Sequence, residues 1–302
     1  MILDDLEEFK IIHNSNIFFD FDIKKLNWLN IGGKTKVFFK PKKLKELKDF
    51  LQLYSNRGKL FVLGSGSNVL FKDNIYNGVI IKLSNNFSSL SKLNNNTIIA
   101  GSSCQQRKLS EFAMENNISG FEYMSCIPGS VGGGLKMNSG CFGFEFKDNL
   151  ISLQCIDTQG NIKVIPSSKI NFSYRKIELD DNLIFLSATF KGKTNDREKI
   201  QLKIEKMINK KNNAQPSKIK TGGSTFTNPI DQTNKKAWEL IKVSVPKNTS
   251  FGDAYISEKH CNFFINKKNA TFNEMITLIN FVKKKVKDKT GIKLNLEIKI
   301  IE

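Results

Sequence analysis

A run of small residues constrains this chain more than any other feature. It reads Ile127-Pro128-Gly129-Ser130-Val131-Gly132-Gly133-Gly134 and continues to Gly140 through Asn138 and Ser139. A second glycine-rich turn, Gly64-Ser65-Gly66-Ser67-Asn68, directly follows a short apolar segment. Glycine permits positive φ and lets backbone N–H groups approach an anion closely. Two such turns suit a dinucleotide, whose two phosphates and two ends need separate contacts.

Neither turn carries a common nucleotide-binding fingerprint. The sequence has no GxGxxG that opens a helix and no complete GxxxxGK[ST] Walker motif. A classical Rossmann fold and a P-loop are therefore not favoured.

The composition is that of an ordinary globular protein apart from its charge. A chain of 302 residues with 39% hydrophobic content predicts a buried core and two domains, or three small ones. The net charge of +18 is interpreted as lysines spread over a solvated surface. No RRM, KH, helix-turn-helix or zinc pattern accompanies it, so we expect no nucleic-acid partner. A basic protein still attracts anions, and a phosphate-bearing substrate would fit.

Cysteine and histidine usage argues against a metal site. None of the five cysteines forms a CxxC pair, and the two histidines, His13 and His260, lie at no ligand spacing. The odd number of cysteines fits reduced thiols. The sequence has no basic, apolar leader and no apolar run of transmembrane length. We therefore expect a cytoplasmic monomer without a membrane partner.

Hydrophobic periodicity predicts an α+β chain. Helices are expected from Pro41 to about 57, at 107–117, 194–212 and 233–241, and from a Thr271/Glu274 capping box to about Gly291. Strands are expected at 60–63, 78–83, 97–100, 150–157, 161–165, 182–190 and 292–300, the last with strict alternation. The interval 121–143 is expected to be a loop with tight turns.

Several segments in chain order resemble the family of UDP-N-acetylenolpyruvoylglucosamine reductases. Besides the two glycine-rich turns, they are Asn30-Ile31-Gly32-Gly33, Tyr174-Arg175, Gly222-Gly223-Ser224-Thr225-Phe226 with Asn228-Pro229, Ser257-Glu258-Lys259-His260-Cys261-Asn262-Phe263 and Glu297-Ile298-Lys299. An ordered set over nearly the whole chain is far more specific than any one glycine motif.

The resemblance implies a two-part FAD-binding domain of the PCMH type, followed by a small α+β substrate-binding domain. We expect one FAD-binding subdomain at 1–85, joined by a C-terminal strand at 291–302, and the other at 86–206. The substrate-binding domain is expected at 207–290. The short spacing between Tyr174 and Gly222 predicts the form of the family that lacks an inserted substrate loop.

The resemblance also implies the reaction. NADPH reduces bound FAD, which passes a hydride to the enolpyruvyl group of a UDP-sugar and yields UDP-N-acetylmuramate for peptidoglycan. The residues assigned to FAD are Gly64, Ser65, Gly66, Ser67, Asn68, Ile127, Gly129, Ser130, Gly132, Gly133, Asn138 and Gly140. Tyr174 and Asn228 are assigned to the substrate.

Three residues match the catalytic set of the family. Arg175 would stabilise the charge that develops beside a carboxylate, since a guanidinium stays charged and can form two bonds to a carboxylate. Ser224 would protonate the adjacent carbon, because an enolate is a strong enough base for a weakly acidic hydroxyl. Glu297 completes the set. Without the resemblance, these residues read as a loop arginine, a turn serine and an exposed strand carboxylate.

The sequence departs from the family where the substrate would bind. Thr227 stands where Lys is common, Tyr255 where Gln or Met is common, and Val243-Ser244-Val245-Pro246-Lys247-Asn248 replaces a glycine-rich stretch. Lys247, Lys259 or another nearby lysine is a candidate for the missing charge. Gly134 and Ser139 stand where alanines are common, which preserves small size.

Alternative functions stay open at this point. An oxidase or dehydrogenase of the same flavin fold could act on a sugar or alcohol, and it would not require Ser224. A nucleic-acid-binding protein would depend on the net charge alone. A catalytically degenerate relative is disfavoured because Arg175, Ser224 and Glu297 are all present.

Overall fold

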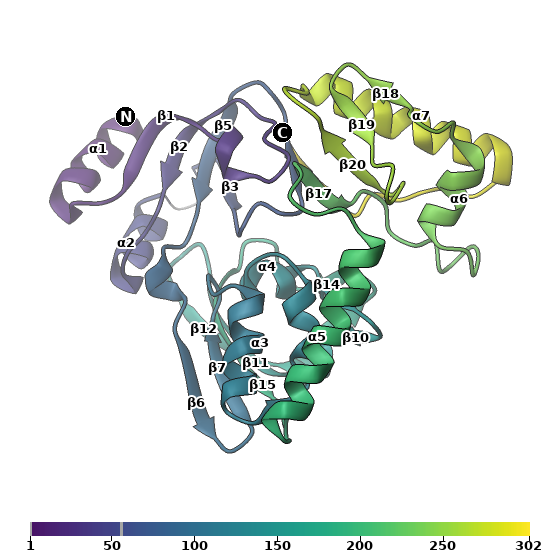
Figure 1. Ribbon diagram of the computed structural model, residues 1–302. Coiled ribbons are helices and arrows are strands. Elements are labelled where there is room, and N and C mark those ends of the chain that lie inside the picture. Colours follow the sequence, from purple (N-terminus) through teal and green to yellow (C-terminus); the bar gives the residue numbers. More distant parts are fainter. Residues whose placement is uncertain (1, 55–56) are drawn as a thin grey trace. The chain divides into compact units, whose positions relative to one another are not determined.

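The computed structural model (Figure 1) describes residues 2–54 and 57–302, and its chain crosses several times between two compact units. Unit 1 contains the residues up to Phe21, Lys36–Ser65 and Asn77–Lys210. Unit 2 contains Asp22–Thr35, Gly66–Tyr76 and Lys211–Glu302. The three-part division expected from the resemblance remains a prediction.

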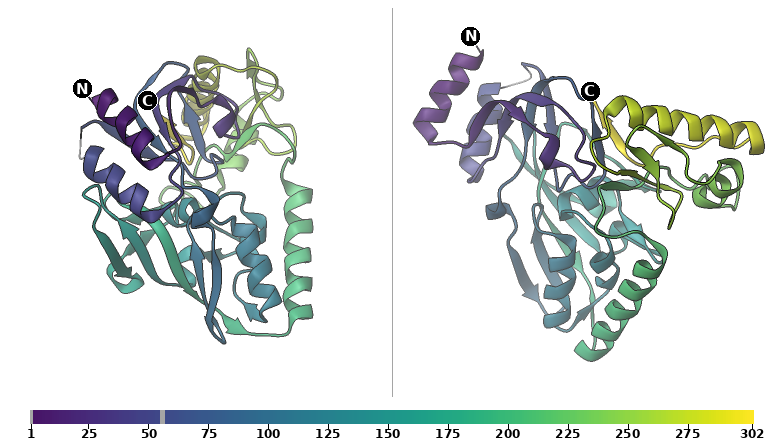
Figure 2. Two further views of the ribbon diagram at one scale, coloured as in Figure 1. Left: turned by 90° about the vertical axis from the view of Figure 1, so that its left-hand side faces the viewer. Right: turned by 45° about the horizontal axis from the view of Figure 1, so that its top comes forward.

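Unit 1 begins with a four-stranded sheet of order β1-β2-β5-β3. Its strands are β1 (Ile17–Asp22), β2 (Lys34–Phe39), β5 (Tyr76–Ile81) and β3 (Lys59–Val62), of which β3 and β5 are parallel. Helices α1 (Ile2–His13) and α2 (Leu44–Tyr54) lie side by side (Figure 2). The apolar stripe of α2 is buried, and Phe50 stacks on Phe39 with 4.1 Å between ring centroids.

A second sheet of unit 1 is antiparallel throughout and has the order β12-β11-β15-β7-β6. Its strands are β12 (Ile162–Pro166), β11 (Leu150–Ile156), β15 (Ile184–Lys191), β7 (Thr97–Gly101) and β6 (Leu90–Asn94). Helices α3 (Gln106–Glu115) and α4 (Val131–Lys136) lie against one face (Figure 1), where Leu109 and Leu135 join the core. Helix α5 (Arg197–Ala214) buries only Ile200 and Ile204, which explains its charged sequence.

Short strand pairs and single 3₁₀ turns complete unit 1 and its borders. The pairs are β8 (Ile118–Ser119) with β16 (Lys193–Thr194), β9 (Gly140–Cys141) with β10 (Phe144–Glu145), and β13 (Asn171–Ser173) with β14 (Lys176–Glu178). The 3₁₀ turns of unit 1 are Asn85–Phe87, Glu122–Cys126, Phe146–Asp148 and Ser167–Lys169, and Lys24–Leu26 is a 3₁₀ turn of unit 2.

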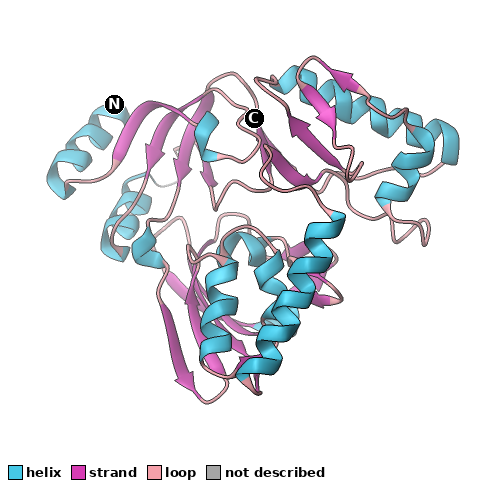
Figure 3. Ribbon diagram, viewed as in Figure 1, coloured by secondary structure: helices cyan, strands magenta, loops and turns pink. Residues whose placement is uncertain are grey.

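Unit 2 is built on an antiparallel sheet of order β17-β20-β19-β18, with α7 (Phe272–Thr290) along it (Figure 3). Its strands are β17 (Thr221–Ser224), β20 (Phe263–Asn266), β19 (Ala254–Ile256) and β18 (Ser250–Phe251). Met275, Leu278 and Val282 of α7 share a core with Phe264, and α6 (Ala237–Ser244) packs on α7. The C-terminal strand β21 (Lys299–Ile301) runs parallel to β4 (Val69–Phe71).

The expected α+β composition and the strongly periodic elements are confirmed, and two predictions are wrong in part. The interval 121–143 is not all loop, since it contains the Glu122–Cys126 turn and helix α4. The segment 292–300 forms a ladder only at its end, although Leu294 and Ile298 are buried between exposed Lys293, Asn295 and Lys299. Before the ladder, Leu296 forms only an isolated antiparallel bridge with Phe226, in which the N–H of Thr227 donates to Asn295 O and the N–H of Glu297 donates to Thr225 O, each at 2.9 Å.

The predicted helix at 233–241 begins later, at Ala237. The N–H of Ala237 donates to Asn228 Oδ1 at 3.0 Å, and the N–H of Lys236 donates to Glu239 Oε2 at 2.7 Å. These side-chain acceptors satisfy N–H groups of the first turn and fix the start of the helix. No helix among the described residues is long and apolar enough to cross a lipid bilayer.

Replacing Thr271 with Ala is expected to lower the free energy of unfolding by about 0.5–2 kcal/mol. The Thr271 hydroxyl accepts the N–H of Glu274 at 3.2 Å, and Glu274 Oε2 accepts the N–H of Thr271 at 2.9 Å. Denaturant unfolding measures the loss. Thr277→Ala, on the exposed side of α7, serves as the control and should stay within about 0.5 kcal/mol of wild type. Equal losses in both variants would contradict a specific role of the cap.

Candidate active site

Gly64, at the start of the shorter glycine-rich turn, contacts Ser130 of the longer run, and both residues lie in unit 1. A Cβ atom on Gly64 would lie 2.8 Å from Ser130 Oγ and 3.8 Å from Gly133 Cα, so no side chain fits there without a shift. Gln105 Nε2 donates to Ser65 Oγ at 3.2 Å. The two turns therefore approach each other at Gly64 and Ser130.

The glycines of the longer run serve close packing more than anion binding. The N–H groups of Val131 and Gly132 donate to Cys104 O and Ser102 O, each at 2.8 Å, and the N–H of Gly133 donates to Ser130 Oγ at 3.3 Å. A Cβ on Gly132 would lie 2.9 Å from Ser102 Cβ. The N–H groups of Ser65 and Ser130 donate to no acceptor within the described residues, so they can serve a phosphate.

Lys82 places a half-buried ammonium beside this contact and was missed from the sequence. Its Nζ donates to Gly64 O. Burial lowers the pKa of Lys82, and the charge of Lys40 lowers it further. Over residues 2–54 and 57–302 no carboxylate forms an ion pair with Lys82. Such a cation favours an anionic ligand nearby. The sequence signal was a lysine directly after an apolar strand.

The remaining residues of the first turn, Gly66 to Asn68, belong to unit 2. Gly66 has φ +71°, and a Cβ there would collide with the backbone of Leu26 and Asn27. Asn68 Nδ2 donates to Glu297 O at 3.0 Å, and the N–H of Lys299 donates to Asn68 O at 3.0 Å. Asn68 therefore fixes the backbone that carries Glu297.

Ser224 lies at the end of β17, directly after an irregular step in its pairing with β20. The register shifts between Thr221 and Ser224, and Gly223 has φ +78° with open space at its Cβ position. Such a bulge re-aims the side chain that follows it. The N–H of Glu297 donates to Thr225 O at 2.9 Å, so the segments of Ser224 and Glu297 are neighbours in unit 2.

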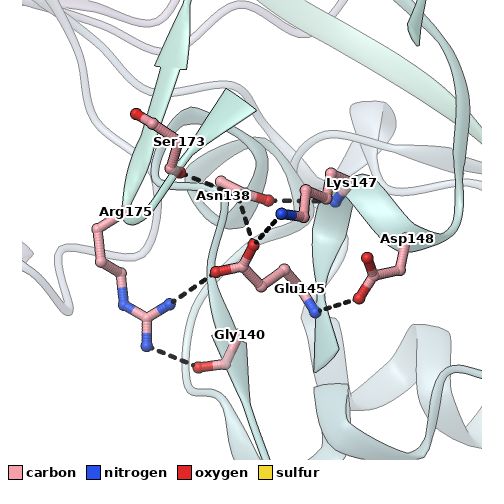
Figure 4. Close-up of polar contacts among 7 residues, drawn as sticks. All are labelled: Asn138, Gly140, Glu145, Lys147, Asp148, Ser173 and Arg175. Carbon is pink, nitrogen blue, oxygen red and sulfur yellow. Dashed lines mark hydrogen bonds and ion pairs between the residues drawn. The ribbon is translucent and has the colours of Figure 1, made fainter. Parts of the chain in front are cut away.

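Arg175 lies in unit 1 at the second position of the two-residue turn between β13 and β14. Its φ of +60° is uncommon for a residue other than Gly, Asn or Asp, and such outliers often mark functional positions. The guanidinium lies 4.8 Å from the centre of the Tyr174 ring and donates to Gly140 O at 2.8 Å. Glu145 Oε1 lies 3.9 Å from Arg175 Nη1, and Figure 4 shows both Glu145 and Gly140 facing the guanidinium.

Asn138 connects the glycine-rich run to this arginine rather than to open space. Its side chain is fully buried, at 0% exposure. Nδ2 donates to Glu145 Oε2 at 3.0 Å and to Ser173 O at 3.2 Å, while Oδ1 accepts the N–H of Lys147 at 3.1 Å (Figure 4). Both amide hydrogens thus have protein acceptors, which leaves none for a flavin.

The predicted substrate residues of unit 2 also have structural contacts. Asn228 Oδ1 caps α6, as described above. Lys259 Nζ donates to Asn212 O at 2.6 Å, whereas Lys247 is exposed. Lys267 Nζ lies 4.5 Å from the centre of the Tyr255 ring, so a cation is present at the position where the sequence departs from the family. No group of three potential metal ligands occurs within the described part of the chain.

Known proteins match both parts of the chain. Residues 35–165 match the family model described as FAD binding domain, and residues 215–301 match the model of the C-terminal domain of UDP-N-acetylenolpyruvoylglucosamine reductase. The reductase of that name from Pelagibacter ubique is 54% identical over 302 residues, which cover 100% of both chains. The one from Rickettsia prowazekii is 42% identical over 282 residues, or 93% of this chain and 94% of its own.

A solved structure agrees with these relatives. The crystal structure of UDP-N-acetylenolpyruvylglucosamine reductase from Thermus caldophilus superposes with a TM-score of 0.81 at 26% identity. It covers 95% of this chain and 99% of that one. The expected FAD-binding domain and the expected reductase resemblance are thereby confirmed, whereas the roles of individual site residues stay predictions.

The stability of the protein is expected to fall as the pH drops below about 6.5 because of His260. This ring lies 4.8 Å from Phe263, and its Nδ1 is buried without a hydrogen-bond partner in the described part. Burial lowers the pKa of His260 below its ordinary 6.5. The unfolded chain therefore takes up a proton first as the pH falls, and the folded state loses stability between pH 6.5 and the lower folded pKa.

Thermal unfolding of wild type and His260→Phe at pH 8 and pH 5.5 checks this expectation. The Phe variant keeps an aromatic ring but does not titrate, so it should lose less stability on acidification. An equal loss in both proteins would show that other groups cause the decline.

Proposed function

The chain belongs to the UDP-N-acetylenolpyruvoylglucosamine reductase family, and we propose that it reduces the enolpyruvyl group of this UDP-sugar to give UDP-N-acetylmuramate. NADPH is the proposed reductant, and peptidoglycan precursor synthesis is the proposed context. The match over the full length of the Pelagibacter ubique reductase is the observation that carries the proposal.

The residues around Gly64 and Ser130 fit a flavin dinucleotide. The space beside Gly64 excludes a Cβ, the N–H groups of Ser65 and Ser130 are available as donors, and Lys82 adds a positive charge. We assign these residues to the pyrophosphate, since backbone donors and a half-buried cation suit two phosphates. When bound, FAD supplies hydride transfer between NADPH and the substrate.

We assign the electrostatic part of the reaction to Arg175. The enolpyruvyl group carries a carboxylate, and negative charge builds up beside it as the double bond is reduced. A guanidinium fixed by Tyr174 and Gly140 O can hold that carboxylate and the developing charge without reorganising. Tyr174 then acts mainly as the surface on which the guanidinium lies.

We assign proton transfer to Ser224, with Glu297 from the neighbouring segment as the second group of this part of the site. The bulge at Gly222–Gly223 leaves the Ser224 side chain half-exposed at the end of β17. Its hydroxyl donates a proton to the carbon next to the carboxylate, and Glu297 polarises the site. Lys267 beside Tyr255 is the proposed replacement for the charge missing at Thr227.

The assay of the purified protein with FAD tests the function directly. NADPH oxidation is expected to require the enolpyruvyl UDP-sugar, and the product should gain two hydrogen atoms by mass. Oxidation of NADPH by oxygen alone, without product, would contradict the proposal and indicate an oxidase.

Ser224→Ala is expected to leave the reduction of FAD by NADPH intact and to slow the transfer to substrate by about 10²–10⁴-fold. Rapid-mixing experiments measure the two half-reactions separately. Ser250→Ala, on β18 of the same unit, is the matched control and should behave as wild type. A comparable loss in both half-reactions of the Ser224 variant would indicate a structural role.

Lys82→Met is expected to weaken FAD binding by about tenfold or more, since a hydrogen bond with a charged group contributes roughly 1.5–3 kcal/mol. Titration of the apoprotein, followed by flavin fluorescence, gives the dissociation constant. Lys92→Met removes an exposed lysine from β6 and should not change it. Unchanged affinity in the Lys82 variant would remove this residue from the pyrophosphate site.

A further inference from the structure

We propose that Glu145 is a positioning residue for Arg175, and that it holds the guanidinium where the substrate carboxylate is bound. Glu145 follows the glycine-rich run and lies in β10, and it is not among the site residues that the sequence motifs indicated. This proposal rests on the proposed function, because it concerns the binding of the substrate carboxylate by Arg175.

The Glu145 carboxylate joins three groups from different parts of unit 1. Oε1 faces Arg175 Nη1 at 3.9 Å, and Oε2 accepts hydrogen bonds from Asn138 Nδ2 and Lys147 Nζ, each at 3.0 Å. Figure 4 shows this carboxylate between the arginine and the other two residues. Asp148 Oδ2 accepts the N–H of Glu145 at 2.8 Å and fixes its backbone.

Glu145 restrains the guanidinium through its charge, whereas Gly140 O restrains it through a short hydrogen bond. A separation of 3.9 Å lies beyond hydrogen-bond range, so Glu145 acts on Arg175 through charge, whereas the 2.8 Å bond to Gly140 O fixes one end of the fork. The carboxylate is also shared with Lys147, whose pKa is raised by the hydrogen bond to Glu145. Arg175 and Lys147 therefore share the charge of the Glu145 carboxylate.

Burial makes this arrangement effective. The side chains of Arg175 and Glu145 are only 19% and 20% exposed, so their interaction is screened less than that of a surface pair. The fully buried Asn138 holds Glu145 from the other side and also binds Ser173 O, next to the Arg175 turn. The contacts thus form a closed path from the end of the glycine-rich run to the turn that carries Arg175.

Positioning of this kind predicts a selective kinetic effect. Without the charge of Glu145, the guanidinium loses one of its restraints and samples more orientations. A misplacement of about 1 Å can cost around 100-fold in rate, so we expect Glu145→Gln to slow hydride transfer to substrate by about 10–100-fold. Reduction of bound FAD by NADPH involves no substrate carboxylate and should stay within about threefold of wild type.

The experiment uses the FAD-loaded full chain and follows both half-reactions by rapid mixing. Glu178→Gln is the matched control, because Glu178 is an exposed carboxylate on β14 of the same hairpin and pairs with Lys176 at 3.7 Å. It should transfer hydride as wild type does. Flavin content and thermal unfolding are measured for every variant.

A double-mutant cycle with Arg175→Lys separates positioning from general stability. If Glu145 acts through Arg175, its replacement should cost little in the Arg175→Lys background, where the fork is already absent. The same fold-loss in both backgrounds, or equal losses in both half-reactions, would overturn the proposal. Wild-type transfer rates in Glu145→Gln would also overturn it.

Two further outcomes complete the test. If Glu145→Gln loses its flavin or unfolds, Glu145→Asp is tested in its place. A folded Glu145→Asp variant with a raised KM for the enolpyruvyl substrate supports positioning. Unfolding of both variants would assign Glu145 a structural role. A wild-type enzyme whose reduced flavin is not reoxidised by the enolpyruvyl UDP-sugar overturns the proposed function itself. Normal wild-type turnover with an unaffected Glu145→Gln overturns only the role of Glu145.

Discussion

The contact between Gly64 and Ser130 is the constraint on which the proposed cofactor site depends. The 2.8 Å from a Gly64 Cβ position to Ser130 Oγ brings together two turns that lie 66 positions apart in the sequence. Ser130 also caps α4 through the N–H of Gly133, so the same hydroxyl fixes the helix and contacts the first turn. The N–H groups of Ser65 and Ser130 and the Lys82 ammonium all belong to the residues around this contact.

The same run of glycines organises the proposed substrate side of unit 1. Helix α4 contains consecutive glycines that cost helix stability, yet a Cβ on Gly134 would lie 2.6 Å from the Phe146 ring. Close packing therefore explains why glycines occupy these helix positions despite their low helix propensity. Its end leads to Asn138, which orders Glu145 and, through it, Arg175. One segment thus connects the proposed cofactor site to the proposed charge-stabilising arginine.

Much of the fold follows from local signals, and the exceptions have physical reasons. The apolar stripe of α2 and the capping box of α7 are complete within a few residues, so they were predictable. Helix α4 was missed because tertiary packing overrode a poor propensity. Most of 292–300 was wrongly predicted as a strand, because its alternating burial is accompanied by only one isolated bridge, at Leu296, before the ladder begins. Lys82 was missed because its partner Gly64 lies 18 positions away, and Glu145 because its contact with Arg175 joins separate segments of the chain.

In the candidate site, too, the motifs indicated which residues matter, but not which residues they contact. The positions of Arg175, Ser224 and Glu297 were predicted through resemblance, and the structure adds the Gly223 bulge and the Asn68 contact that shape unit 2. The amide hydrogens of Asn138 and the capping oxygen of Asn228 have protein partners that no motif indicated.

The central claim is that this chain is a flavin enzyme that reduces an enolpyruvyl UDP-sugar. The most direct measurement is the visible absorption spectrum of the purified, FAD-reconstituted protein, reduced by NADPH without oxygen and then mixed with that substrate. The account predicts a stoichiometric flavin spectrum that bleaches with NADPH and returns when the substrate is added. A protein that takes up no FAD, or whose reduced flavin is reoxidised only by oxygen, would contradict it.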